Sequence, residues 1–145
     1  MIVMLRVTII LVVQMLILLG ATSVSASSMR CKLNQVLTVT QSGKLEPNPL
    51  ESAYLGNDLV VDMNSGVVYH AGFGNETYPI KSILDRGSMS SSFKLLSSSV
   101  PGQASDNDHP IFVNTVYLQI DTWIDGSQKP FLVIESNNIG YGVCQ

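Results

Sequence analysis

Short runs in which apolar and polar residues alternate cover most of the chain beyond its N-terminal apolar segment. The longest lies in residues 111–124, where Val116, Leu118 and Ile120 alternate with polar residues such as Gln119. Alternation with period two places one set of side chains on each face of an extended strand. The other strand-like runs are rich in β-branched and aromatic residues and end near Gly, Pro, Asn, Asp or Ser; they cover residues 31–40, 58–63, 67–70, 78–84, 92–96, 130–134 and 139–144.

These runs predict an all-β fold, an antiparallel meander of about seven or eight strands. At most one short helix is expected, in residues 48–55, where Asn48 precedes Pro49 and Glu51 in the pattern of a capped helix start. Such a sheet buries its apolar face by closing into a small barrel or by folding into a sandwich.

The two cysteines, Cys31 and Cys144, fall in the first and last predicted strands. In an exported protein this placement predicts a disulfide that joins the two ends of the sheet and favours closure. Two free buried thiols are the alternative. Pairing would also remove the thiols as nucleophiles.

The first 26 residues resemble a secretory signal peptide in their organisation. Arg6 supplies a basic residue, residues 7–19 are almost entirely apolar, and residues 24–26 are small enough for cleavage. We therefore expect residues 1–26 to be removed and residues 27–145 to form a single periplasmic or secreted domain. An uncleaved anchor is the alternative, but the apolar run is short for a membrane span, so no stable membrane anchor is expected after cleavage.

The predicted mature chain is acidic. Without Arg6 it has seven Lys and Arg residues against eleven Asp and Glu residues, a formal net charge near −4. It contains no cluster of basic residues, which argues against nucleic acid or an anionic membrane surface as a partner.

Residues 58–70 can be interpreted either as the opening of a calcium-binding loop or as a hairpin. Asp62 and Asn64 occupy the first and third ligand positions of an EF-hand loop, but Gly66 comes one residue early and Phe73 stands at the twelfth position in place of Glu. The sequence therefore favours a structural turn formed by Asp62, Asn64 and Gly66.

A three-residue loop over residues 64–66 would pair Met63 with Val67 and Val61 with Tyr69. In that register one face of the hairpin carries Leu59, Val61, Met63, Val67 and Tyr69.

The segment 101–110 is rich in Pro, Gly, Ser, Asn and Asp, which predicts an exposed loop. Asp106, Asp108 and His109 within it are weak candidates for a metal site, and the favoured interpretation is a solvated polar loop. We expect no metal and no cofactor.

No catalytic constellation is visible, so the chain is not predicted to be an enzyme. It lacks a G-x-S-x-G nucleophile elbow, and its strand carboxylates have the pattern of a solvated face. Asn75-Glu76-Thr77 matches a glycosylation acceptor, which would matter only in a eukaryotic host.

The landmarks of the chain resemble those of short exported bacterial all-β proteins of unknown function, which have an early Cys, a V-D-x-x-[ST]-G hairpin and a C-terminal Cys. The resemblance implies a periplasmic or secreted all-β protein and supplies no catalytic residue. The matching positions are Cys31, residues 61–66, 85–88, 92–93, 129–131 and 142–144.

The chain is also similar, more loosely, to periplasmic inhibitors of animal-type lysozyme, small barrels with a disulfide-tied end. In that family a loop bearing Ser and Arg enters the lysozyme cleft, and Arg86 and Ser88 are the corresponding candidates here. The leading expectation remains a non-enzymatic exported protein that binds an envelope protein or a small apolar ligand, or that has a structural role.

Overall fold

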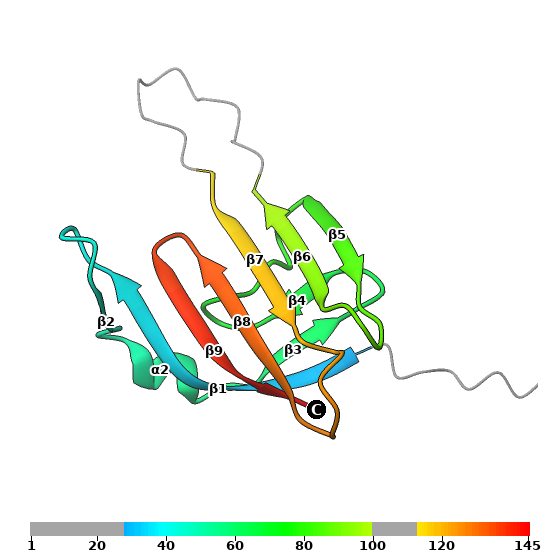
Figure 1. Ribbon diagram of the computed structural model, residues 1–145. Helices are drawn as coiled ribbons and strands as arrows, with labels where there is room; N and C mark the ends of the chain where they lie inside the picture. The colour runs from blue at the N-terminus through cyan, green and yellow to red at the C-terminus, as the bar shows by residue number, and fades with distance from the viewer. Residues whose placement is uncertain (1–27, 100–112) are drawn as a thin grey trace, which may run out of the picture.

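The computed structural model describes residues 28–99 and 113–145, which form nine β-strands and one short helix (Figure 1). The predicted leader and the candidate metal residues Asp106, Asp108 and His109 lie outside the described residues. No helix within the described ranges is long and apolar enough to cross a membrane. The elements are β1 (Ser28–Val39), β2 (Leu45–Pro47), α2 (Glu51–Leu55), β3 (Leu59–Asp62), β4 (Val67–Tyr69), β5 (Ile80–Arg86), β6 (Phe93–Ser98), β7 (Thr115–Ile120), β8 (Lys129–Glu135) and β9 (Asn138–Cys144).

All nine strands belong to one antiparallel sheet, as the alternating pattern predicted. The order is β4-β3-β1-β9-β8-β7-β6-β5, with β2 paired to the second half of β1. The sheet curls so far that it forms a nearly closed barrel (Figure 1). The long strand β1 makes this possible. Its first residues, Ser28 to Cys31, pair with β3, and Cys31 to Thr38 pair with β9.

The interior of the barrel is filled by side chains. Val116, Leu118 and Ile120 of β7 are fully buried, which confirms the predicted inward face of that strand. Phe73 and Phe93 are the largest of the fully buried side chains. Fully buried aromatic and branched residues at these positions give the packed interior typical of a small barrel.

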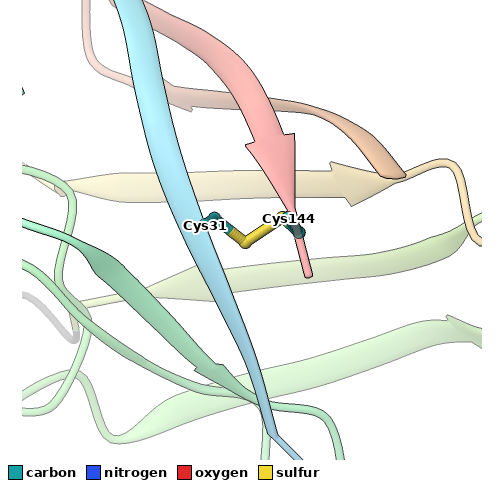
Figure 2. The surroundings of a disulfide bond; sticks show 2 residues. All are labelled: Cys31 and Cys144. Atoms are coloured by element: carbon teal, nitrogen blue, oxygen red, sulfur yellow. A yellow bond between two sulfur atoms is a disulfide. The ribbon is translucent and has the colours of Figure 1, made fainter. Parts of the chain in front are cut away.

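Cys31 and Cys144 form the predicted disulfide, which joins β1 to β9 (Figure 2). Both residues are fully buried, and they are directly paired in the ladder. On the outer side of the disulfide, Arg30 N donates to Gln145 O at 3.0 Å and Gln145 N donates to Arg30 O at 2.8 Å. A disulfide in this position is consistent with folding in an oxidising compartment.

The predicted register of the β3–β4 hairpin is wrong by one residue. The structure pairs Asp62 with Val67 and Val61 with Val68, because the loop has four residues and Gly66 N donates to Asp62 O at 2.8 Å. A shift of one residue reverses the faces of a strand. Val68 is therefore buried, while Tyr69, predicted to share the face of Val61, is 50% exposed.

The short helix begins later than predicted. Asn48 does not cap it; its Oδ1 accepts from Leu50 N at 2.7 Å, and α2 starts at Glu51. The Glu51 carboxylate instead accepts from Val36 N at 3.0 Å and so ties the helix to β1. A tertiary contact has replaced the local capping interaction.

Candidate functional site

The Asp62 turn is a self-contained structural unit. Asp62 Oδ1 accepts from Asn64 N at 2.9 Å and from Ser65 N at 3.3 Å, and Oδ2 accepts from Ser65 Oγ at 2.8 Å. These hydrogen bonds, that from Ser65 Oγ foremost, lower the pKa of the Asp62 carboxyl. Gly66 has φ of 72°, and a Cβ there would lie 2.8 Å from Leu95 Cδ1, so the position requires glycine.

Within residues 28–99 and 113–145, no group of three or more His, Cys, Asp or Glu residues could hold a metal ion. Asn64 contributes only its backbone N–H to the hydrogen bonds of the Asp62 turn. The geometry of this stretch is that of a hairpin turn.

His70 is a structural histidine of the core. Its Nδ1 accepts from Gly72 N and from Phe73 N, each at 3.1 Å, so the proton resides on Nε2, which donates to Tyr54 O at 3.2 Å. Burial lowers the pKa of the ring and favours its neutral form. Both nitrogens are thus occupied within the protein.

Asn75, the first residue of the glycosylation motif, is fully buried between β4 and β6. Its Oδ1 accepts from Val68 N at 2.7 Å, and its Nδ2 donates to Gly66 O and to Ser97 Oγ, each at 2.9 Å. Its own N–H donates to Val68 O at 2.9 Å. Asn75 therefore serves as a hydrogen-bonding partner for the free edge of β4, and it is not accessible for glycosylation in the folded protein.

Tyr78 and Glu135 form a polar contact beside the β8–β9 turn. The buried Tyr78 hydroxyl donates to Glu135 Oε1 at 3.0 Å. Burial raises the pKa of the half-buried Glu135 carboxyl, and the hydrogen bond from Tyr78 opposes that rise only in part. The carboxylate is thus held in a setting that disfavours its charge.

We expect Glu135→Gln to stabilise the protein at neutral pH. A raised carboxyl pKa means that the folded state holds the Glu135 proton more tightly than the unfolded state does. The stability that this protonation provides is therefore fully present below the unfolded pKa of 4.5 and is lost as pH rises through the folded pKa. Gln retains an oxygen acceptor for Tyr78 without the charge. The gain should be at most about 1 kcal/mol, since half of the group is in contact with solvent.

Chemical denaturation of Glu135→Gln and wild type at pH 4 and pH 7.5 measures this effect. The gain should appear at pH 7.5 and shrink at pH 4. Glu46→Gln, at an exposed position of β2, is the matched control. An equal gain at both pH values, or the same gain in the control, would contradict the argument.

The loop between β5 and β6, residues 87–92, is ordered by its own side chains. Asp85 Oδ1 accepts from Gly87 N at 2.9 Å and from Ser91 Oγ at 3.2 Å. Ser88 N donates to Ser91 O at 2.9 Å, and Ser88 Oγ accepts from Ser90 N at 3.0 Å. The run of serines thus closes a tight turn through hydrogen bonds among its own residues.

The loop between β7 and β8, residues 121–128, braces the β5–β6 loop. Thr122 Oγ1 donates to Ser91 O at 2.8 Å, and Asp121 Oδ1 accepts from Ser92 Oγ at 2.8 Å. Gly87 has φ of 73°, and a Cβ there would lie 2.5 Å from Thr122 Oγ1, so the two loops are in direct contact. We call residues 85–92 and 121–128 together the loop end.

Three large side chains project from the loop end. Met89 is 95% exposed and Trp123 is 50% exposed, each on a loop whose backbone is held by hydrogen bonds. Arg86 is exposed as well, and no carboxylate of the described residues lies within 4.0 Å of it. Met, Trp and Arg are enriched in protein interfaces, whereas Ser and Asp are depleted.

The sequence indicated only part of the loop end. Arg86 and Ser88 are the candidate inhibitor-loop residues; Arg86 is exposed, whereas Ser88 Oγ accepts a hydrogen bond within the turn. Met89 and Trp123 were missed. The available signal was a lone Trp and a Met within stretches of turn-forming residues, where large apolar side chains are unexpected.

The chain matches no family model, no curated protein and no solved structure.

Proposed function

We propose that this protein is an exported, non-enzymatic binding protein that recognises another protein through its loop end. The observation that carries the proposal is the exposure of Met89 and Trp123 on two loops that brace each other through Thr122. A loop backbone that is ordered before binding does not have to be ordered on association, which lowers the entropic cost of presenting its apolar side chains. A rigid scaffold that presents residues on loops is a common arrangement for recognition.

Surface recognition is favoured over an internal apolar ligand. The barrel interior is filled by fully buried side chains, among them Phe73, Phe93 and Leu118. A ligand inside would have to displace these side chains and lose their packing. A partner at the loop end requires no such rearrangement.

Export is supported by two features. Residues 1–26 have the organisation of a cleavable signal peptide, and Cys31 is bonded to Cys144. The resemblance to exported bacterial proteins favours the periplasm or the cell exterior, so the partner is proposed to be an envelope protein.

Site-specific crosslinking tests the proposal. A photoreactive amino acid at position 89 should give a discrete adduct with one protein of an envelope extract, and Trp123→Ser should lower its yield at least about tenfold by removing a hot-spot side chain. The same photoreactive residue at Leu50, which is 64% exposed beside α2, is the matched control. Equal adducts from positions 89 and 50, or no effect of Trp123→Ser, would contradict recognition through the loop end.

A second candidate function is inhibition of an animal-type lysozyme, and the exposed Arg86 on the braced loop favours it. In this case the loop end would enter an enzyme cleft. Lysozyme activity should fall in the presence of micromolar wild-type protein and recover with Arg86→Gln. Full lysozyme activity at that concentration of wild type removes this alternative without affecting the first.

A further inference from the structure

His70 ties the end of β4 to the turn that follows it. The residue is 8% exposed, and its Nδ1 accepts from Gly72 N and from Phe73 N at 3.1 Å each. Its Nε2 donates to Tyr54 O at 3.2 Å, so the ring also joins this turn to α2. One neutral imidazole therefore holds the turn and the helix together.

Aromatic packing encloses the ring. The ring centroid of His70 is 6.2 Å from that of Tyr54 and 5.6 Å from that of the fully buried Phe73. The Tyr54 ring also lies against Gly72, where a Cβ would be 1.8 Å from Tyr54 Cε1. Water therefore has little access to Nδ1 and cannot readily replace it as the acceptor for the two amides.

The same turn leads to the residue that completes the edge of β4. Phe73 N donates to the His70 ring, and Gly74 N donates to His70 O at 2.9 Å. Asn75 follows directly and pairs with Val68 of β4 through two hydrogen bonds, at 2.7 and 2.9 Å. The chain thus reverses direction between Val68 and Asn75 around the imidazole. We call residues 70–75 the His70 turn.

Protonation of the imidazole is incompatible with this arrangement. A neutral imidazole has one acceptor nitrogen, whereas both nitrogens of the imidazolium are donors. A proton on Nδ1 would point at two backbone N–H groups, and these three donors would share no acceptor. Because a buried donor without an acceptor is unfavourable, the turn has to open before Nδ1 can hold a proton.

The charged groups near the ring supply no acceptor for that proton. The titratable side chains on β4, on α2 and in the segments that follow them are Glu51, Tyr54, Asp58, Tyr69, Glu76 and Tyr78. The Glu51 carboxylate accepts from Val36 N, Asp58 lies 3.7 Å from Arg30 Nε, and phenols are uncharged in acid. Glu76 acts on the ring through its charge, which favours the imidazolium and opposes the effect of burial.

We propose that the His70 turn is a pH-sensitive switch, which opens when His70 binds a proton and so releases the edge of β4. Opening removes Asn75 from Val68, whose N–H and C=O then face outward without partners. Unpaired groups of this kind on an edge strand can pair with an added strand. The closed turn at neutral pH blocks that pairing.

The pH range of the switch follows from the setting of the ring. Burial lowers the pKa of His70, although the backbone groups of Tyr54 and Asn57 and the charge of Glu76 act in the opposite direction. The stability that neutral His70 gives to the closed turn is therefore complete above the unfolded pKa of 6.5 and is lost as pH falls through the folded pKa.

Native-state amide hydrogen exchange of the disulfide-bonded protein at pH 7.5 and pH 5.5 tests the switch. The protection factors of the Gly72 and Phe73 amides should fall about tenfold, because each pH unit below 6.5 favours the protonated, open turn by a further factor of about ten. The Val68 amide, which donates to Asn75, should follow them.

Dilute urea separates opening of the turn from global unfolding. A local opening exposes little surface, so exchange at Gly72 and Phe73 should not change in urea below the unfolding transition. Exchange of the Leu118 amide in the core strand β7 should accelerate under the same conditions. Equal urea dependence at the two places would overturn the proposal, since protons would then reach His70 only through global unfolding.

His70→Asn is the matched variant. An Asn side-chain oxygen can accept from the amides two and three residues on, as Nδ1 does, but it does not titrate. Protection at Gly72 and Phe73 should therefore be the same at both pH values in this variant. Ring nitrogen NMR spectra of wild type need no variant and should show the Nε2–H tautomer at pH 7.5.

Three results would overturn the proposal: equal protection of wild type at both pH values, the same tenfold fall in His70→Asn, or an Nδ1–H tautomer at pH 7.5. Because neither Met89 nor Trp123 is altered, the outcome is independent of partner recognition by the loop end.

Discussion

Loss of the Cys31–Cys144 bond is expected to lower the free energy of unfolding by about 4 kcal/mol. The bond closes a loop with a sequence separation of 113 residues, so without it the unfolded chain gains a large amount of conformational freedom. The native strands should remain paired, because β1 and β9 are joined by a ladder from Cys31–Cys144 to Thr38–Asn138. The melting temperature should fall by roughly 10–20 °C.

Urea denaturation of oxidised wild type, reduced wild type and Cys31→Ala/Cys144→Ala measures this effect. The reduced protein and the double variant should have similar midpoints, both well below that of the oxidised protein. Their m-values should be larger, because the unfolded state is no longer held compact by the crosslink. An oxidised protein that unfolds at the same urea concentration as the reduced protein would contradict this account.

The sequence predicted the strands and the disulfide because both are governed by local pattern and by position in the chain. Alternation in β7 correctly assigned Val116, Leu118 and Ile120 to the interior. The placement of the two cysteines in the first and last predicted strands correctly predicted their disulfide. The disulfide does not join the two edges of the sheet, however, because β1 and β9 are neighbours inside it and the edges are β4 and β5. Period-two patterning needs no knowledge of distant residues.

Registers and turns were less predictable since they depend on tertiary contacts. Whether Gly66 closes a three- or a four-residue loop cannot be read from residues 62–67 alone, and in the structure Gly66 packs against Leu95 and Ile83 of other strands. In the β8–β9 turn, Asn137 and Asn138 are the residue types that best accept positive φ. The structure instead uses Ser136, with φ of 54°, and Asn137 as the two turn residues.

The loop end could be predicted only as two separate turns. The hydrogen bond from Thr122 Oγ1 to Ser91 O joins residues 31 positions apart, and nothing in either turn indicates the other as its partner. Met89 and Trp123 are exposed on these two turns. Sequence patterns assign such residues to the core by default, because apolar side chains are usually buried.

Asn75→Ala is expected to destabilise the protein by about 3–5 kcal/mol, because it leaves several buried polar groups without partners. Val68 N–H and Gly66 C=O would each lose the hydrogen bond that Asn75 provides at the edge of β4. Burying an unpaired backbone group costs about 1–3 kcal/mol. Ser97 Oγ would also lose its bond to Nδ2 and would keep only a long contact to Val116 O at 3.4 Å.

Two further variants distinguish this structural role from that of a glycosylation acceptor. Thr77→Ala abolishes the motif at an exposed position, so its free energy of unfolding should stay within about 0.5 kcal/mol of wild type. Asn75→Asp keeps the acceptor for Val68 N but sets a carboxylate oxygen against Gly66 O, so it should resemble Asn75→Ala at pH 7. Stability should recover in part at acidic pH, where the protonated carboxyl donates one hydrogen bond. Thermal melts at pH 4 and pH 7 measure these effects. A destabilised Thr77→Ala would show that the motif contributes to stability apart from the hydrogen bonds of Asn75. An Asn75→Ala as stable as wild type would show that Asn75 does not hold the edge of β4 in place.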